Sequence, residues 1–263
     1  MVPYLNVQPL IWQLQKHGKP DNVALKIRAA RPRQLAQELA QGAHDAAIVP
    51  VFEYMLRPEF YTIVPGVSIA SRAEVYSVML FAASSLEQVR RVYLDSGSLT
   101  SINLLRVLMA ERGLKPEYMD SAVAQWQPGD TLNNTEAALL IGDPAMHERG
   151  RHPYQFDLGL LWQRQTGLPF VFAAWLVHPS ARERPINGIL QTAKEYGLHN
   201  LESIARDVAF EYGSTPADTL RYFRENLCYE LGERELAGWR KFSELCVKHR
   251  LINVSPEFRM HEH

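Results

Sequence analysis

The stretch Leu168-Pro169-Phe170-Val171-Phe172-Ala173-Ala174-Trp175-Leu176-Val177 is continuously apolar and aromatic. It is too short to cross a bilayer and is typical of a buried strand. A second extended run covers residues 75–83. These two extended stretches connect a middle α/β unit to a larger α/β unit that is made of both chain ends. This arrangement predicts an α/β protein with two lobes, residues 1–80 with 175–263 and residues 81–174, and a ligand cleft between lobes that close about a hinge.

The first part of the chain alternates strand and helix patterns. Residues 2–5 match the end of a strand, and Pro9 is well placed at the start of a helix. Strand patterns at 24–29 and 45–50 flank a helix that begins near Pro32 and ends at Gly42. This β-α-β-α-β order predicts a parallel sheet, with ligands at the carboxyl ends of its strands, where Asn6 lies.

The remaining elements follow from apolar periodicity. The middle of the chain predicts an extended region at 61–67, strands at 92–94 and 137–141, and a helix at about 100–113. After residue 177 only helices are predicted, at 181–197, 200–213, 216–231 and 233–251, with a frayed tail at 253–263.

Hydroxyl residues gather where the strand at 92–94 leads into the next helix, in the stretch Ser98-Leu99-Thr100-Ser101. The first turn of a helix has unpaired N–H groups and the positive end of the helix dipole, so it stabilises a carboxylate or phosphate. Serine and threonine also cap helices without binding any ligand. The stretch therefore predicts either an anion site or an ordinary helix cap.

Composition restricts the classes of function. The chain has 263 residues, a net charge of −1 and 46% hydrophobic residues, so a large core is expected, and neither a nucleic-acid nor a membrane partner. Cys228 and Cys246 both lie in helix-like segments and indicate neither a disulfide framework nor a metal site, and the histidines have no shared metal-ligand spacing. The first residues lack a signal-peptide pattern, so a cytoplasmic location is expected.

Several segments, in order along residues 1–252, resemble the chorismate dehydratases of the futalosine route to menaquinone, which have the type II periplasmic-binding-protein fold. The most specific segment is Thr166-Gly167-Leu168-Pro169-Phe170-Val171-Phe172-Ala173. The others include Tyr4-Leu5-Asn6, Val75-Tyr76-Ser77-Val78, Ser98-Leu99-Thr100-Ser101, Ile141-Gly142-Asp143 and Asp157-Leu158-Gly159. The sequence departs from the pattern in having few residues before Tyr4, and alanine rather than glycine at Ala73, which predicts a slightly altered cleft wall.

The resemblance implies conversion of chorismate to 3-[(1-carboxyvinyl)oxy]benzoate and water, with no metal or redox cofactor. It also implies that Asn6 and Ser77 are the catalytic pair. We expect them to hydrogen-bond the departing hydroxyl and a substrate carboxylate, which itself takes the proton. Substrate-binding residues are expected at Ser98, Thr100, Ser101 and Asp143, although Asp143 is equally well explained as a helix cap.

Two other functions are alternatives for a protein of this fold. One is a non-catalytic cytoplasmic sensor that binds a small carboxylate, because this fold also serves as a solute receptor. The other is the sister enzyme that makes 1,4-dihydroxy-6-naphthoate, whose N-terminal segment the Tyr-Leu-Asn opening does not resemble. Either a monomer or a homodimer fits the sequence.

Overall fold

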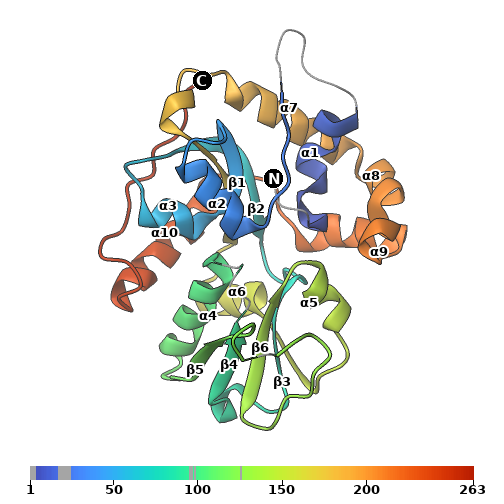
Figure 1. Cartoon of the computed structure of the whole chain (residues 1–263), viewed down its shortest axis with the longest axis vertical. Helices are drawn as coiled ribbons and strands as arrows, with labels where there is room; N and C mark the ends of the chain where they lie inside the picture. Colours follow the sequence, from blue (N-terminus) through green and yellow to red (C-terminus); the bar gives the residue numbers. More distant parts are fainter. Residues whose placement is uncertain (1–3, 17–24, 95–96, 98, 125) are drawn as a thin grey trace.

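The computed structural model describes residues 4–16, 25–94, 97, 99–124 and 126–263. Within these residues the chain forms two lobes, each built on one sheet (Figure 1). The first lobe has a three-stranded sheet in the order β1-β8-β2, and the second has a five-stranded sheet in the order β5-β4-β6-β3-β7. The predicted two-lobed α/β fold is therefore confirmed.

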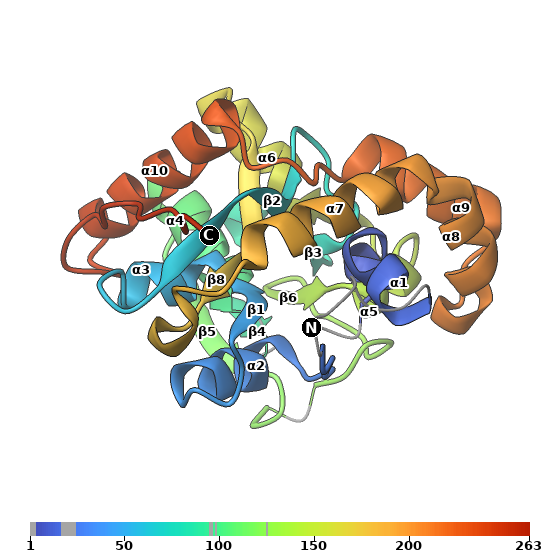
Figure 2. The same ribbon diagram turned by 90° about the horizontal axis from the view of Figure 1, so that it is seen from above.

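The first lobe contains both ends of the described chain. Its strands are β1 (Ala46–Pro50), β2 (Thr62–Ser71) and β8 (Phe170–Val177). Its helices are α1 (Gln8–Lys16), α2 (Pro32–Ala40), α3 (Val51–Leu56), α7 (Ile186–His199), α8 (Leu201–Val208), α9 (Pro216–Arg221) and α10 (Glu233–Lys248). Seen from above, α7 crosses over this sheet while α1, α8 and α9 gather at one side (Figure 2).

The second lobe is formed by the middle of the chain. Its strands are β3 (Val78–Ala82), β4 (Arg91–Leu94), β5 (Glu117–Asp120), β6 (Glu136–Ile141) and β7 (Tyr154–Asp157). Its helices are α4 (Leu99–Glu111), α5 (Asp143–Glu148) and α6 (Leu158–Thr166). The predicted lobe boundaries at 80/81 and 174/175 fall inside β3 and β8, and the division at those residues stays a prediction.

Strand β8 corrects the predicted parallel sheet of the first lobe. It lies between β1 and β2 and pairs antiparallel with both, in a register that runs from Ala46 opposite Val177 to Pro50 opposite Ala173. The apolar stretch that indicated a buried strand is thus the central strand of this sheet. Its partner strands lie about one hundred residues or more earlier in the sequence, so local pattern did not reveal the strand direction.

Four local predictions were also wrong. Residues 25–30 form no strand. Cys228 lies outside any helix, because its backbone pairs with Ala70, and the helical segment after Pro216 ends at Asn226. The C-terminal tail is not frayed, because the N–H of His261 donates to the carbonyl of Ile63 at 2.7 Å and His261 is buried. The strand expected at 2–5 lies partly outside the described residues, and Leu5 begins a 3₁₀ turn.

Candidate functional site

A cavity of about 70 Å³ lies between the two lobes. The first lobe lines it with the segment at Asn6, the end of β1 and the first half of β8, and the second lobe with the starts of β3 and α4 and the end of β6. The described residues that line it are Tyr4, Asn6, Pro32, Ile48, Val49, Pro50, Ile69, Val75, Ser77, Val78, Thr100, Ser101, Ile141, Gly142, Phe172 and Ala173. Four of the predicted site residues, Asn6, Ser77, Thr100 and Ser101, thus come together from distant parts of the sequence.

Asn6 reaches the cavity from a 3₁₀ turn, Leu5–Val7, that directly precedes α1. Leu5 and Val7 on either side of it are fully buried, which anchors the turn in the first lobe. The side-chain Oδ1 of Asn6 is buried and has no hydrogen-bond partner among the described residues. An unpaired buried polar atom costs about 1–3 kcal/mol, and this amide oxygen can accept a hydrogen bond from a molecule in the cavity.

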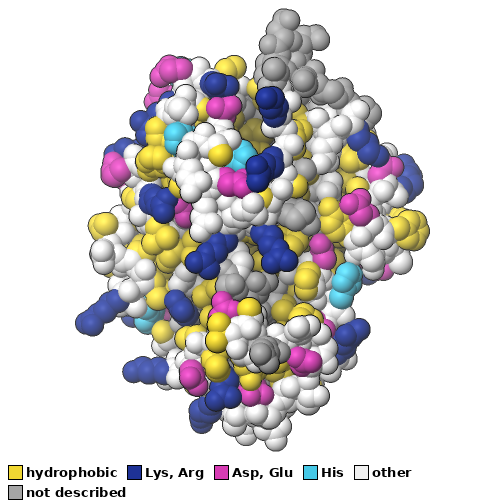
Figure 3. All heavy atoms as spheres, viewed as in Figure 1, with side chains coloured by type: hydrophobic (Ala, Val, Ile, Leu, Met, Phe, Trp, Pro, Cys, Tyr) yellow, Lys and Arg dark blue, Asp and Glu magenta, His cyan; other side chains and the backbone are white. Residues whose placement is uncertain are grey.

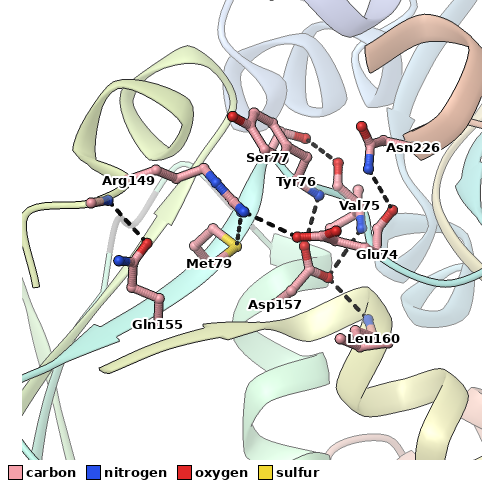
Figure 4. Close-up of polar contacts among 11 residues, drawn as sticks. Glu74, Val75, Tyr76, Ser77, Met79, Arg149, Gln155, Asp157, Leu160 and Asn226 are labelled. Carbon is pink, nitrogen blue, oxygen red and sulfur yellow. Dashed lines mark hydrogen bonds and ion pairs between the residues drawn. The ribbon is translucent and has the colours of Figure 1, made fainter. Parts of the chain in front are cut away.

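Ser77 lies immediately before β3, on the connection between the lobes, and is 1% exposed. The preceding Tyr76 has φ of +68°, which is unusual for a residue with a side chain. The carboxylate of Asp157 holds this conformation, because it accepts the backbone N–H groups of Val75 at 3.0 Å and Tyr76 at 2.7 Å (Figure 4). Burial raises the pKa of Asp157, and these backbone bonds partly oppose that effect.

A second set of contacts holds the Tyr76 side chain. The guanidinium of Arg149 lies 3.8 Å from the centre of the Tyr76 ring and also pairs with Glu74 at 3.1 Å. Figure 4 shows Arg149 and Asp157 meeting the connection at residues 74–77 from the second lobe. The unusual backbone conformation of Tyr76 is therefore held by contacts to both its main chain and its side chain.

The start of α4 supplies the two described hydroxyls of the predicted anion site. Thr100 and Ser101 are both buried and both line the cavity. Thr100 Oγ1 also accepts the backbone N–H of Phe52 from α3 at 3.2 Å, which links the lobes. The first turn of this 13-residue helix therefore borders the cavity, and the N-terminus of a helix carries the positive end of its dipole. Ser98 lies outside the described residues.

Asp143 is adjacent to the cavity but is not among its lining residues. Its Oδ1 accepts the backbone N–H of Leu5 at 3.3 Å, so the carboxylate ties the second lobe to the turn that carries Asn6. Burial raises the pKa of Asp143 to about 6, against the opposing effects of the Leu5 N–H and of His147. The neighbouring Gly142, at φ +64°, leaves room for the Tyr4 ring, which a Cβ there would meet at 3.0 Å.

Asp143 predicts a dependence of stability on pH. Because its pKa is raised above the ordinary value of 3.8, the folded state binds the proton more tightly than the unfolded state, and stability falls as pH rises from about 4 to about 6. The melting temperature of the wild type relative to Asp143→Asn should therefore decrease across this interval and level off above it. Asp45→Asn, at an exposed position, is the control. A difference in melting temperature between wild type and Asp143→Asn that stays constant across this interval would contradict the raised pKa of Asp143.

No Lys, Arg, Asp or Glu is present among the described residues that line the cavity. A ligand carboxylate there would meet hydroxyl, amide and helix N-terminal dipoles rather than a cation. On the surface, Lys and Arg side chains lie along the seam where the lobes meet on the face seen in Figure 3. The cavity is thus a neutral, mainly apolar chamber with a few hydrogen-bonding groups and basic residues outside it.

Sequence patterns missed several residues of this site. Tyr4, Pro32 and Gly142 line the cavity, and only the proximity of Tyr4 to Asn6 and of Gly142 to Asp143 hinted at this. Of the aromatic residues near the central strand, Phe172 lines the cavity, whereas Trp162 and Phe170 pack with Phe242 in the core. The sequence pattern is the same for cavity and core aromatics, so the structure was needed to separate them.

The two-lobed fold with a cavity at the hinge is that of the type II periplasmic binding proteins. A solved structure from Archaeoglobus fulgidus matches with a TM-score of 0.73, covering 96% of this chain and 97% of the other at 14% identity. The periplasmic aliphatic sulphonate binding protein of Escherichia coli matches with a TM-score of 0.62 at 16% identity, covering 98% of this chain and 87% of that one. At these identities the likeness establishes the fold alone.

The family is established by sequence. The model of the menaquinone biosynthesis family matches residues 1–248, and the chain belongs to this family. The chorismate dehydratase of Thermus thermophilus is 30% identical over 263 residues, an alignment that covers 92% of each protein. The family resemblance seen in the sequence is thereby confirmed. Among the described residues, no helix has the length and apolar character needed to cross a membrane.

Proposed function

We propose that this chain is a chorismate dehydratase, a hydro-lyase that converts chorismate to 3-[(1-carboxyvinyl)oxy]benzoate and water in menaquinone biosynthesis. The observation that carries the proposal is the cavity in which Asn6, Ser77 and the start of α4 face one another. Membership of the menaquinone biosynthesis family and the nearly full-length match to a chorismate dehydratase support the same reaction.

The dehydration requires few functional groups from the protein. Loss of water removes a ring hydroxyl and the hydrogen on the carbon that bears the enolpyruvyl ether, and the ring becomes aromatic. Because aromatisation favours the products, the protein needs to orient the substrate, exclude water and assist a poor leaving group. Neither the Asn6 amide nor the Ser77 hydroxyl is a good base at neutral pH, so a carboxylate of the substrate is the proton acceptor in this proposal.

Each group of the cavity then has a role. Asn6 and Ser77 hydrogen-bond the departing hydroxyl and the carboxylate that takes the proton, while Thr100, Ser101 and the N-terminus of α4 hold a substrate carboxylate. The apolar walls, including Phe172, surround the ring. In this proposal Asp143 acts from outside the cavity, by fixing the turn that carries Asn6.

The test is incubation of the purified protein with chorismate alone, followed by chromatography and mass spectrometry. We expect an aromatic product lighter than chorismate by one water, formed without any added cofactor. Chorismate that persists but raises the melting temperature would instead support the non-catalytic binding protein. Chorismate that neither reacts nor shifts the melting temperature would overturn the assignment.

A further inference from the structure

Tyr222 reaches Ser77 from the C-terminal helices of the first lobe. It begins a π-helical turn, Tyr222–Asn226, that continues directly from α9. Its hydroxyl donates to Ser77 Oγ at 2.7 Å, across 145 positions of sequence, and Tyr222 is 2% exposed. Isolated π-helical turns are rare in proteins and occur frequently at functional sites. Ser77, a cavity residue, thus has a buried side-chain partner that the function described so far does not use.

This hydrogen bond leaves the proton of the Ser77 hydroxyl for a second acceptor. A serine hydroxyl has one proton, and Ser77 Oγ already accepts the proton of Tyr222. The backbone carbonyl of Val75 is 3.5 Å from Ser77 Oγ, at the outer limit for a hydrogen bond. A ligand oxygen in the cavity that Ser77 lines would be a closer acceptor. Accepting one hydrogen bond also makes a hydroxyl a stronger donor of the next.

The phenol of Tyr222 keeps its proton at neutral pH. Its burial raises its pKa well above the ordinary value, and the nearby carboxylates of Asp143 and Asp157 act in the same direction. The hydrogen bond to Ser77 opposes this shift only in part. Tyr222 therefore has a proton available to donate to Ser77 Oγ.

The segment that contains Tyr222 contacts other parts of the site as well. The hydroxyl of Tyr229 donates to the backbone carbonyl of Asn6 at 3.0 Å, and the amide of Asn226 donates to the carbonyl of Glu74 at 3.2 Å. Cys228 pairs through its backbone with Ala70, near the end of β2. Residues 222–229 therefore support both Asn6 and the connection that carries Ser77.

We propose that Tyr222 is a positioning residue for the dehydration, which directs the Ser77 hydroxyl proton toward the departing hydroxyl of the substrate. The inference rests on the proposed chorismate dehydratase function. In the step, the ring C–H and ring C–O bonds break and a carbon–carbon double bond forms. The substrate carboxylate that takes the ring proton passes it to the departing oxygen, which leaves as water. Ser77 and Tyr222 keep their protons throughout.

The test is a double-mutant cycle with Tyr222→Phe, Ser77→Ala and the combined variant, each assayed with chorismate. Removing the Tyr222 hydroxyl should lower kcat about tenfold, the effect of one lost hydrogen bond, and leave KM within about twofold. In the Ser77→Ala background the same change should have no further effect on kcat. A role confined to packing would give an equal loss in both backgrounds.

Tyr54→Phe is the matched control. Its hydroxyl is also buried, and it bridges the carbonyl of Glu257 and the N–H of Arg259 in the C-terminal tail, away from the cavity. It should lower the melting temperature about as much as Tyr222→Phe and leave kcat unchanged. A wild-type kcat in Tyr222→Phe, or additive losses of kcat in the double-mutant cycle, would overturn the positioning role of Tyr222. In that case turnover of chorismate by the wild-type protein would still support the proposed function. A wild type without turnover would overturn both.

Discussion

Ser77→Ala is expected to lower kcat for chorismate about 10²-fold with little change in KM. Removing one preorganised donor from an active site typically costs this much, because the donor acts most strongly on the charge that develops as the leaving group departs. The change also leaves the buried Tyr222 hydroxyl without its acceptor, so the free energy of unfolding should fall by about 1–3 kcal/mol. Steady-state kinetics and thermal unfolding of the same preparation separate the two effects.

Ser84→Ala is the matched control for this variant. Ser84 is 4% exposed, lies beyond the far end of β3 from Ser77, and donates to the carbonyl of Asn134 at 2.6 Å. Its replacement removes a buried serine hydroxyl of the same kind, so it should reduce stability and leave kcat unchanged. Turnover by Ser77→Ala at the wild-type rate would remove Ser77 from the catalytic pair.

Gly197→Ala should destabilise the protein by at least about 3 kcal/mol, the upper part of the range for overpacking a core. Gly197 lies in α7 where this helix packs against α1, and a Cβ at this position would overlap the backbone carbonyl oxygen of Pro9 and lie 2.7 Å from its carbonyl carbon. Because both colliding atoms belong to backbone, no side-chain rotation relieves the overlap. The helices must separate, and α1 follows directly on the turn that holds Asn6.

Gly188→Ala in the same helix provides the comparison. Nothing lies within 4 Å of a Cβ built on Gly188, and the residue is exposed. Alanine has a higher helix propensity than glycine, so the free energy of unfolding of this variant should rise by up to about 1 kcal/mol. Chemical denaturation of the two variants measures both values. A Gly197→Ala protein as stable as the wild type would show that α1 and α7 are not held at this distance.

The periodic segments of the sequence were predicted well because their structure depends on local chemistry. Pro32 at the first turn of α2, Leu35 and Leu39 on its buried face and Gly42 after its end were enough to place that helix. The apolar run at β8 was long enough for a strand and too short for a membrane. Strand direction was not predictable, since a strand buried on both faces has the same apolar pattern in parallel and antiparallel sheets.

The candidate site was also predictable only in part. Asn6, Ser77, Thr100 and Ser101 were identified from the family resemblance and from the hydroxyls at a helix start, and all four line one cavity. Their catalytic and binding roles stay predictions. Asp143 was expected either to bind substrate or to cap a helix. Its contact in the structure is the N–H of Leu5, and substrate binding by Asp143 stays a prediction. A carboxylate just after a strand has the same local sequence whether it faces a ligand or another segment of backbone.

Patterns along the sequence were sufficient to predict the two-lobed α/β class, the helices with strong periodicity, the family and the residues that match the family motifs. These depend on neighbours a few positions apart or on similarity read along the chain. The antiparallel position of β8, the pairing of the C-terminal tail with β2 and the contact of Tyr222 with Ser77 could be found only in the folded structure. Each of these depends on which distant segments pack together, because burial and hydrogen bonding are satisfied in space rather than along the chain.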